Sequence, residues 1–344
     1  MTEQDGYSVG RWTRRSAIAT SGVGGVALAL VFVPYVLSIN AIEQLTSLLI
    51  LAILAAMWNA LAGYGGLVSV GQQAFIGLGA YGTILCANTF GLPPYLAMVL
   101  AAVVAGALAL PISFLVLRLR GGQFAIGTWV VAEALLLLTI LDQDLGGGTG
   151  TSLQGMSRMD PLSRQAYTYW LTLAFGILLL GLVFWLLRSR NGASLQAIRD
   201  DEDAAASLGV RVQASKRLLF VVASFGCGAA GALTLANTLF IQPQSIFGVQ
   251  WTAYMIFMVL VGGIGTFEGP IIGAIVFFVL QNRFADSGAW YLIGLGLMAI
   301  AFALFLPQGI WGVVDRRMDV QLLPVGYQLR RIGAARRDRA AVAE

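Results

Sequence analysis

Residues 95–117, with the sequence YLAMVLAAVVAGALALPISFLVL, decide the fold, because these 23 residues contain no charged side chain. A helix needs about 20 apolar residues to cross a hydrocarbon core about 30 Å thick. Similar runs recur along the chain of 344 residues, of which 58% are hydrophobic and 11% charged. Too little polar surface remains to coat a water-soluble fold. The sequence therefore predicts a protein that crosses a membrane several times.

The other apolar runs are also continuous, whereas the strands of a membrane barrel alternate apolar and polar residues. This difference predicts an all-α, polytopic helical bundle. Eight runs reach or approach the length of a spanning helix: residues 16–37, 45–61, 73–88, 95–117, 124–141, 167–187, 218–240 and 290–306. Two shorter runs, residues 251–263 and 270–281, are separated by GIGTFE and form short spans, broken helices or a re-entrant pair. We expect eight to ten membrane helices, some of them short or interrupted by glycine.

Basic residues set the orientation, because lysine and arginine stay preferentially on the cytoplasmic side of short loops. With ten crossings and the N-terminus inside, only Arg158, Arg164 and Arg283 of the 21 basic residues fall outside. The predicted organisation is a cytoplasmic arm (1–15), six membrane helices (16–187), a cytoplasmic segment (188–217), four further helices (218–306) and a basic cytoplasmic tail (307–344). The net charge of +4 fits a positive inner surface beside anionic lipid and gives no indication of nucleic acid binding.

The composition excludes most catalytic chemistry. The chain contains no histidine, which rules out Ser-His-Asp triads, HExxH zinc sites and histidine proton relays. Its single lysine, Lys216, stands between Ser215 and Arg217, so the Gly-Lys-Ser/Thr run of a P-loop is missing. Cys86 and Cys227 have neither disulfide nor metal-ligand spacing. We expect no enzyme, no metal site and no cofactor, and uphill transport would need an ion gradient or another polypeptide.

The segment RSRNGASLQAIRDDEDAAASLGVRVQASKR, residues 188–217, is an abrupt polar interruption of the apolar pattern. Ser194 is suited to cap the start of a helix and Gly209 to end it, so we predict one helix over residues 194–208. Its apolar positions fall on one face and are Leu195, Ile198, Ala205 and Leu208. The segment is either a short amphipathic helix that binds a soluble partner or a solvated connector.

Within this segment, SLQAIRDDEDAAASLGV resembles the cytoplasmic coupling segment of ABC importer permeases. In that family an acidic residue, alanines and a spaced glycine dock into a cleft of the ATPase subunit. The pattern Glu-Ala-Ala-x-x-x-Gly is matched by Asp203, Ala204, Ala205 and Gly209, with Glu202 as the acid if the match shifts by one residue. The resemblance implies coupling to an ATPase through these residues and through Ser194, Ile198 and Arg199.

Residues 45–312 are also similar to the membrane subunits of branched-chain amino acid importers of the LivM type, and to the related urea and amide permeases. Besides the polar segment, four segments carry this similarity: NALAGYGGLVSVGQQAFIGLGAY (59–81), LRLRGGQFAIGTWVVAE (117–133), FIQPQSIFGVQWTAYMIFMVLVGGIGTFEGPIIGA (240–274) and FLPQGIWG (305–312). In the last of these, Gln308 replaces the lysine or arginine that such permeases often carry. The resemblance implies a non-enzymatic permease in a bacterial cytoplasmic membrane.

The same resemblance implies the partners and the cargo. The partners are a second permease subunit, two cytoplasmic subunits that bind ATP and an extracytoplasmic solute-binding protein, all assembled in membrane lipid. Branched-chain or other hydrophobic amino acids are the expected solutes, with urea or short amides as the alternative within the family. An alternative of another class is a carrier that works alone on an ion gradient.

Two Gly-rich interruptions of the apolar runs, one with Gly63 and Gly71 and one with Gly262, Gly263 and Gly265, are predicted to lie on the same face of the membrane. Glycine allows sharp bends and close helix packing, so packing alone is the alternative explanation for each. Polar groups at membrane depth need partners, which a solute pathway can supply. The pathway candidates are Asn59, Tyr64, Gln72, Gln73 and Glu133. Glu133 is expected to face the bundle interior, in the pathway or in an interhelical hydrogen bond.

The longest predicted external loop comprises residues 142–166 and is rich in glycine. We expect a flexible loop that is either a landing surface for a solute-binding protein or a solvated linker.

Overall fold

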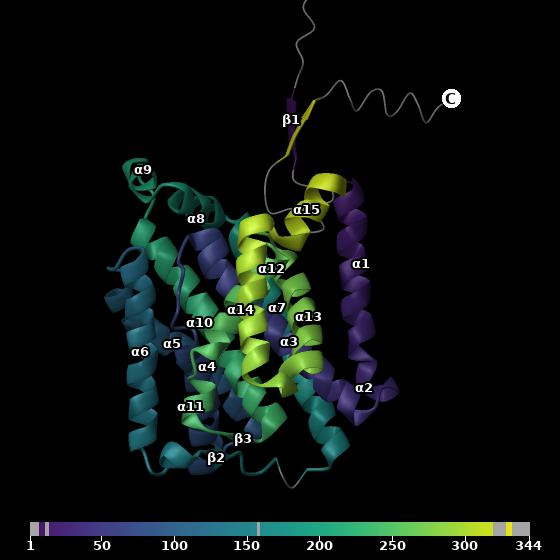
Figure 1. The fold of residues 1–344 in the computed structure, drawn as a ribbon, viewed down its shortest axis with the longest axis vertical. Helices are drawn as coiled ribbons and strands as arrows, with labels where there is room; N and C mark the ends of the chain where they lie inside the picture. The colour runs from purple at the N-terminus through teal and green to yellow at the C-terminus, as the bar shows by residue number, and fades with distance from the viewer. Residues whose placement is uncertain (1–6, 11–13, 157–158, 319–327, 332–344) are drawn as a thin grey trace, which may run out of the picture.

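The computed structural model describes residues 7–10, 14–156, 159–318 and 328–331. Arg158 and most of the N-terminal arm and basic tail lie outside the described residues. The described chain is a bundle of long helices that run between two opposite ends (Figure 1). Its strands are confined to two short antiparallel pairs, β1 with β4 and β2 with β3. The predicted all-α bundle is confirmed.

The elements follow one another in this order. The first part contains β1 (Tyr7–Gly10), α1 (Arg14–Val31), α2 (Val33–Val36), α3 (Ile39–Asn59), the π-helix η1 (Ala60–Tyr64), α4 (Gln73–Ile84), the π-helix η2 (Leu85–Thr89), α5 (Pro94–Val116), α6 (Gly122–Leu141), the 3-10 helix η3 (Gly147–Thr149), β2 (Thr151–Ser152) and α7 (Pro161–Arg188). The second part contains α8 (Arg190–Asp200), α9 (Glu202–Ser207), α10 (Val212–Thr238), β3 (Phe240–Ile241), α11 (Pro243–Ile246), α12 (Gln250–Gly262), α13 (Gly269–Phe284), the 3-10 helix η4 (Ala285–Ser287), α14 (Ala289–Phe305), α15 (Gly309–Met318) and β4 (Gln328–Arg331).

Seven helical segments of the described chain are long and apolar enough to cross a membrane: Ile39–Tyr64, Pro94–Val116, Gly122–Leu141, Pro161–Arg188, Val212–Thr238, Pro243–Gly262 and Trp290–Arg316. This number is below the eight to ten expected, because α1 begins with two arginines and α4 and α13 have only 12 and 16 residues. Both α1 and α13 nevertheless run lengthwise beside the longer helices (Figure 1).

The interior is built around α3 and α10. Within their most apolar stretches 78% and 72% of the residues are buried, compared with 17% for α6 and 11% for the span that contains α14. Small residues allow the closest crossings. A Cβ atom on Gly79 would lie 1.9 Å from Gly228 O, and one on Gly231 would lie 1.9 Å from Ile76 O. The backbones of α4 and α10 are therefore in direct contact, as small residues permit in membrane bundles.

The two short apolar runs are separate helices, α12 and α13, packed against each other. A Cβ atom on Gly262 would lie 1.9 Å from Gly269 O, and one on Gly273 would lie 1.7 Å from Met258 O. Residues 263–268 join the two helices. Glycine at these positions is thus required by the close contact between two backbones.

The two ends of the bundle carry different elements (Figure 1). One end carries α8, α9, α15 and the β1–β4 pair, and we call it the α9 end. The opposite end carries β2, β3 and α11, and we call it the β2 end. Because β1 pairs with β4, with Tyr7 opposite Arg331, the described N-terminal and C-terminal segments meet at the α9 end.

The described part of the loop 142–166 is folded onto the bundle, contrary to the flexible connector expected. Its strand β2 pairs with β3. Asn88 of η2 clamps the loop, because its Nδ2 donates to Ser152 O at 2.9 Å and its Oδ1 accepts from Gln154 N at 3.0 Å. The glycines of the loop form tight turns with positive φ rather than loose chain, at Gly146, Gly147, Gly150 and Gly155.

Candidate coupling site

The polar segment folds as two helices, α8 and α9, and the prediction of one helix over residues 194–208 is wrong. Ser189 caps α8 by accepting a hydrogen bond from Asn191 N at 3.2 Å. Ser194, the predicted cap, lies inside α8 and donates to Arg190 O at 3.1 Å. The helix breaks at Asp201, whose backbone is extended with φ −156° and ψ 111°.

Asp201 breaks the helix because its side chain caps the next one. Its Oδ1 accepts hydrogen bonds from Asp203 N at 3.0 Å and from Ala204 N at 2.9 Å. Such an N-cap typically stabilises a helix by about 1 kcal/mol. The C-terminal end of α9 is followed by Gly209 with φ +83°, a conformation that glycine adopts without strain. The prediction that Gly209 ends the helix is confirmed.

The predicted apolar face is correct for three of its four members. Leu195, Ile198 and Ala205 are at most 4% exposed, but Leu208 is 84% exposed. The break at Asp201 rotates α9 relative to α8, so that Leu208 leaves the shared face. Leu208 is the C-cap residue of α9.

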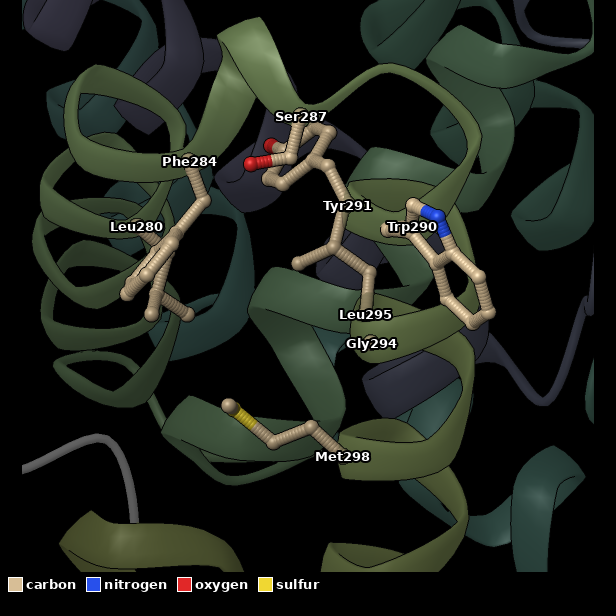
Figure 2. Close-up of a pocket in the computed structure, with 8 residues that line it drawn as sticks. All are labelled: Leu280, Phe284, Ser287, Trp290, Tyr291, Gly294, Leu295 and Met298. Carbon is tan, nitrogen blue, oxygen red and sulfur yellow. The ribbon is translucent and has the colours of Figure 1, made fainter.

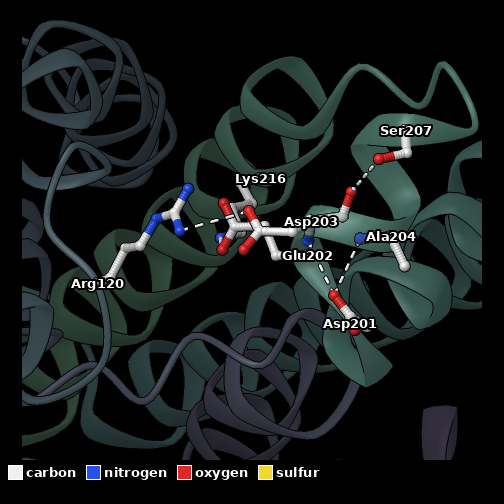
Figure 3. Close-up of polar contacts among 7 residues, drawn as sticks. All are labelled: Arg120, Asp201, Glu202, Asp203, Ala204, Ser207 and Lys216. Atoms are coloured by element: carbon white, nitrogen blue, oxygen red, sulfur yellow. Dashed lines mark hydrogen bonds and ion pairs between the residues drawn. The ribbon is translucent and has the colours of Figure 1, made fainter.

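Glu202 and Asp203 have different surroundings (Figure 3). Lys216 Nζ lies 2.6 Å from Glu202 Oε2, and these side chains are only 10% and 23% exposed. Asp203 lies 3.5 Å from Arg120, with side chains 80% and 68% exposed. Of the two acids that match the coupling pattern, Glu202 is held within the chain and Asp203 is open to a partner.

The outer surface of α9 is small and mixed in character. Its exposed residues are Asp203, Ala204, Ala206, Ser207 and Leu208. Single exposed leucines are ordinary on protein surfaces. Here, however, the leucine adjoins two exposed alanines and one carboxylate on a capped, projecting helix.

Arg199 of α8 reaches the end of η1. Its Nη1 donates a hydrogen bond to Gly63 O, one of the last carbonyl groups of a helix, which have few donors within the helix itself. A Cβ atom on Gly265 would lie 2.7 Å from this Nη1, and one on Gly66 would lie 3.5 Å from Arg199 Cα. We call these four residues the arginine junction. Tyr64 is buried beside it.

Asn59 joins the two Gly-rich interruptions from inside the bundle. Its Nδ2 donates to Thr266 O at 2.8 Å, and its Oδ1 accepts from Gly265 N at 2.8 Å. A Cβ atom on Gly63 would lie 2.3 Å from Asn59 Oδ1 and 2.6 Å from Gly265 N. The two interruptions thus lie together. The side chain of Asn59 binds the protein's own backbone.

Gly263 extends the same contact to the start of α15. It has φ +130°, and a Cβ atom on Gly309 would lie 2.4 Å from Gly263 N. Together with Gly262, these glycines allow three chain segments to meet without side chains between them.

The other interruption, residues 65–72, is non-helical backbone that side chains hold in place. Trp58 Nε1 donates to Ser69 O at 2.9 Å, and Val70 N donates to Thr128 Oγ1 at 3.2 Å. A Cβ atom on Gly71 would lie 2.0 Å from Thr128 O. Irregular backbone at membrane depth needs such internal partners. Residues 65–72 are therefore a packed structural unit.

Gln72 and Gln73 are fully buried next to this unit. Thr252 Oγ1 donates to Gln73 Oε1, and Gln72 Nε2 donates to Ser69 Oγ at 3.3 Å. Gln72 Oε1 and Gln73 Nε2 have no hydrogen-bond partner among the described residues. Buried polar atoms normally have a partner. These two retain the capacity to bind water or the polar groups of a solute.

Glu133 lies on α6, and no hydrogen bond between it and another pathway candidate is found among the described residues. It is half-buried on α6, and its Oε1 accepts a hydrogen bond from Trp129 Nε1 at 3.0 Å. Because α6 lies at the edge of the bundle (Figure 1), Glu133 is only half-buried in this chain rather than enclosed in the interior as expected.

Two cavities lie near the β2 end. An apolar one of about 270 Å³ between α13 and α14 has Leu280 and Phe284 on one side and Trp290 and Leu295 on the other (Figure 2). It offers no charged group to a zwitterion. A polar one of about 550 Å³ is lined by Asn40, Glu43, Gln44, Ser47, Gln281 and Asn282. Within the described residues, no group of three or more Cys, Asp or Glu side chains is placed to hold a metal ion.

Several residues of the site were not predicted from the sequence. Asp201 carried a usable signal, because an aspartate followed by two acidic residues is typical of a helix start. Lys216 and Thr128 carried none, since their partners are distant in the sequence and only the tertiary fold brings them together.

Comparison with known proteins identifies the family. Residues 40–306 match the family model described as branched-chain amino acid transport system, permease component. The chain is 27% identical over 303 residues to the high-affinity branched-chain amino acid transport system permease protein LivM of Salmonella typhimurium, covering 80% of this chain and 71% of that protein. The LivM protein of Escherichia coli is 28% identical over the same coverage.

A more distant relative is the probable branched-chain amino acid transport permease protein LivM of Methanocaldococcus jannaschii, at 25% identity over 54% of this chain and 53% of that protein. Among solved structures, PsaBC from Streptococcus pneumoniae in complex with Fab matches with a TM-score of 0.46 and 14% identity, over 82% of this chain and 96% of that one. The family model covers most of the sequence, including α8, α9, η1 and residues 263–268, and ends before α15. The chain therefore belongs to the family of permease components of branched-chain amino acid transport systems.

Proposed function

We propose that this chain is the membrane subunit of an ATP-driven importer and that α9 receives the movement of a separate ATPase subunit. One observation carries the proposal: α9 is a short helix, capped by Asp201, that projects from the bundle with Asp203, Ala204 and Leu208 outward. Its other side is tied to α10 through Glu202 and Lys216. A helix that is exposed on one side and anchored on the other can transmit force from a docked partner.

The proposed orientation of the chain in the membrane follows from the role given to α9. The α9 end lies in the bacterial cytoplasm, together with the N-terminal and C-terminal segments, because the ATP-binding subunits are cytoplasmic. The β2 end faces outward and receives the solute-binding protein. The fixed position of the loop held by Asn88 supports this, since a folded surface loses less conformational entropy on binding than a flexible loop does.

A second permease subunit is proposed to cover α6. This helix is only 17% buried, yet it carries Glu133 in the middle of an apolar run. A carboxylate exposed to lipid at the membrane centre costs about 3 kcal/mol on insertion scales. A solute pathway between two permease subunits would give Glu133 polar surroundings.

The proposed solutes are branched-chain or other hydrophobic amino acids, as the relatives' names indicate. The polar cavity supports an amino acid, because Glu43 can bind its ammonium group and the amides around it can bind its carboxylate. Urea remains the alternative that the test must include.

The test is uptake of labelled L-leucine into proteoliposomes that contain the chain with its second permease, ATP-binding and solute-binding subunits. We expect uptake only with ATP and the ATP-binding subunits, and no competition by urea. Concentration of leucine by the chain alone under a proton or sodium gradient would instead identify a gradient-driven carrier. ATP-dependent uptake of urea would replace the proposed solute.

A further inference from the structure

We propose that Arg199 is a positioning residue that fixes α8 to the end of α3, so that movement of α9 acts on α3 and on residues 263–268 together. The proposal rests on the proposed function and names the route by which that movement enters the bundle. Besides the exposed ion pair of Asp203 with Arg120, two less exposed polar contacts hold α8 and α9 to the bundle. Glu202 and Lys216 connect α9 to α10, and Arg199 connects α8 to Gly63 O.

The contact with Gly63 O suits the side chain of an arginine. Gly63 lies at the C-terminal end of the continuous helix formed by α3 and η1, where carbonyl groups lack intrahelical donors and the helix dipole is negative. A guanidinium group supplies both a hydrogen bond and a positive charge at that end. Arg199 as a whole is exposed, but its Nη1 is part-buried at this contact.

The glycines around Arg199 allow its guanidinium group to approach the backbone. Gly66 and Gly265 have φ of +66° and +75°, and a Cβ atom on Gly265 would lie 2.7 Å from Arg199 Nη1. A side chain at position 265 would therefore displace the guanidinium group. The contact requires glycine for its conformation and for its space.

A movement of Arg199 would be transmitted further because Asn59 links α3 to residues 263–268. Asn59 lies on α3 and binds Gly265 and Thr266 through both ends of its amide. The stretch of α3 and η1 is 78% buried, the highest value among the candidate spans of the described chain. A displacement of Arg199 thus acts on the central helix of the bundle and on the connection between α12 and α13.

The first test is Arg199→Gln in the reconstituted full complex, with leucine uptake and ATP hydrolysis measured in parallel. We expect uptake per ATP hydrolysed to fall about tenfold while hydrolysis changes by less than about twofold. Arg199→Lys keeps a charge near Gly63 O and is expected to give an intermediate ratio. Arg190→Gln, an exposed arginine of the same helix, is the control and should leave the ratio unchanged. An unchanged ratio in Arg199→Gln would overturn the proposal.

The second test is Gly265→Ala, which leaves Arg199 in place but removes its space. We expect the same loss of uptake per ATP hydrolysed. Gly288→Ala is the matched control, because Gly288 has φ +57° and nothing would lie within 4 Å of its Cβ atom. If Gly265→Ala and Gly288→Ala lower uptake per ATP hydrolysed equally, backbone strain explains the loss and the proposed contact with Arg199 is wrong.

The third test does not require the ATPase. In the purified full-length chain, Arg199→Gln is expected to speed hydrogen–deuterium exchange in α8 and in η1, whereas Arg190→Gln is not. Unchanged exchange in η1 would contradict the link. Failure of ATP-dependent uptake in the unmodified complex would overturn the proposed function, while the exchange rates report on the arginine junction alone.

Discussion

Lys216 Nζ lies 2.6 Å from Glu202 Oε2 and ties α9 to α10 in a setting largely shielded from water. Lys216 is the only lysine in the sequence. The other ion pair of the segment, between Arg120 and Asp203, is longer and well exposed. The two pairs therefore contribute differently to the stability of α9.

Lys216→Gln removes the shielded pair and leaves Glu202 without its cation. We expect the local free energy of unfolding of α9 to fall by about 2 kcal/mol, because a largely shielded charged hydrogen bond is lost. Hydrogen–deuterium exchange of residues 202–207 measures the change. Arg120→Gln breaks the exposed pair and should alter this free energy by less than about 0.5 kcal/mol. Equal effects of Lys216→Gln and Arg120→Gln would contradict the different contributions assigned to the two ion pairs.

Asp201→Ala removes the cap of α9. The amides of Asp203 and Ala204 then lose their acceptor, and α9 should be destabilised by about 1 kcal/mol. Faster exchange of these two amides checks the prediction. Asp200→Ala is the control, since Asp200 lies at the end of α8 and is exposed. The capping role is refuted if Asp200→Ala gives the larger effect.

The fold was largely predictable from the sequence. Continuous apolar runs predict helices, because only helices and closed barrels satisfy the backbone within lipid and barrel strands alternate apolar and polar residues. The break at Asp201 was not predicted, although an aspartate before two acidic residues is typical of a helix start, because the surrounding residues favour one continuous helix. Nor was the edge position of α6, because its apolar residues would suit burial in protein or exposure to lipid equally well.

Some residues of the candidate site were predicted from the sequence, but the contacts between them were not. The spacing of Asp203, Ala204 and Gly209 marked the segment without showing that Glu202 turns inward. Asn59 was selected because polar groups at membrane depth need partners, and the structure supplies those partners from backbone more than 200 positions away. Such contacts leave no periodic signal in a single sequence.

Gly231→Ala tests the crossing of α4 and α10. Its Cβ atom would lie 1.9 Å from Ile76 O, so the helices must separate and the protein should lose about 2 kcal/mol of stability. Thermal unfolding in detergent measures this loss. Gly181→Ala places a methyl group where nothing lies within 4 Å and should leave the unfolding temperature unchanged or raise it slightly. Equal unfolding temperatures of the two variants would refute the close crossing.

Glu133→Gln tests the proposed pathway beside α6. We expect leucine uptake to fall about fivefold in the assembled complex, because the solute loses a charged group along its route. Trp129→Phe removes only the hydrogen bond to Glu133 and should have a smaller effect. Normal uptake by Glu133→Gln would remove this residue from the pathway. Loss of the second permease subunit from the complex would assign it to subunit packing instead.

The most direct test of the coupling surface is a photo-crosslinking amino acid placed at Leu208 in cells that express the whole transporter. We expect a covalent adduct with the ATP-binding subunit, because Leu208 is 84% exposed at the end of α9. The same amino acid at Gln154, at the β2 end, should give no such adduct. An adduct between position 208 and the external solute-binding protein, or between position 154 and the ATP-binding subunit, would contradict the proposed coupling.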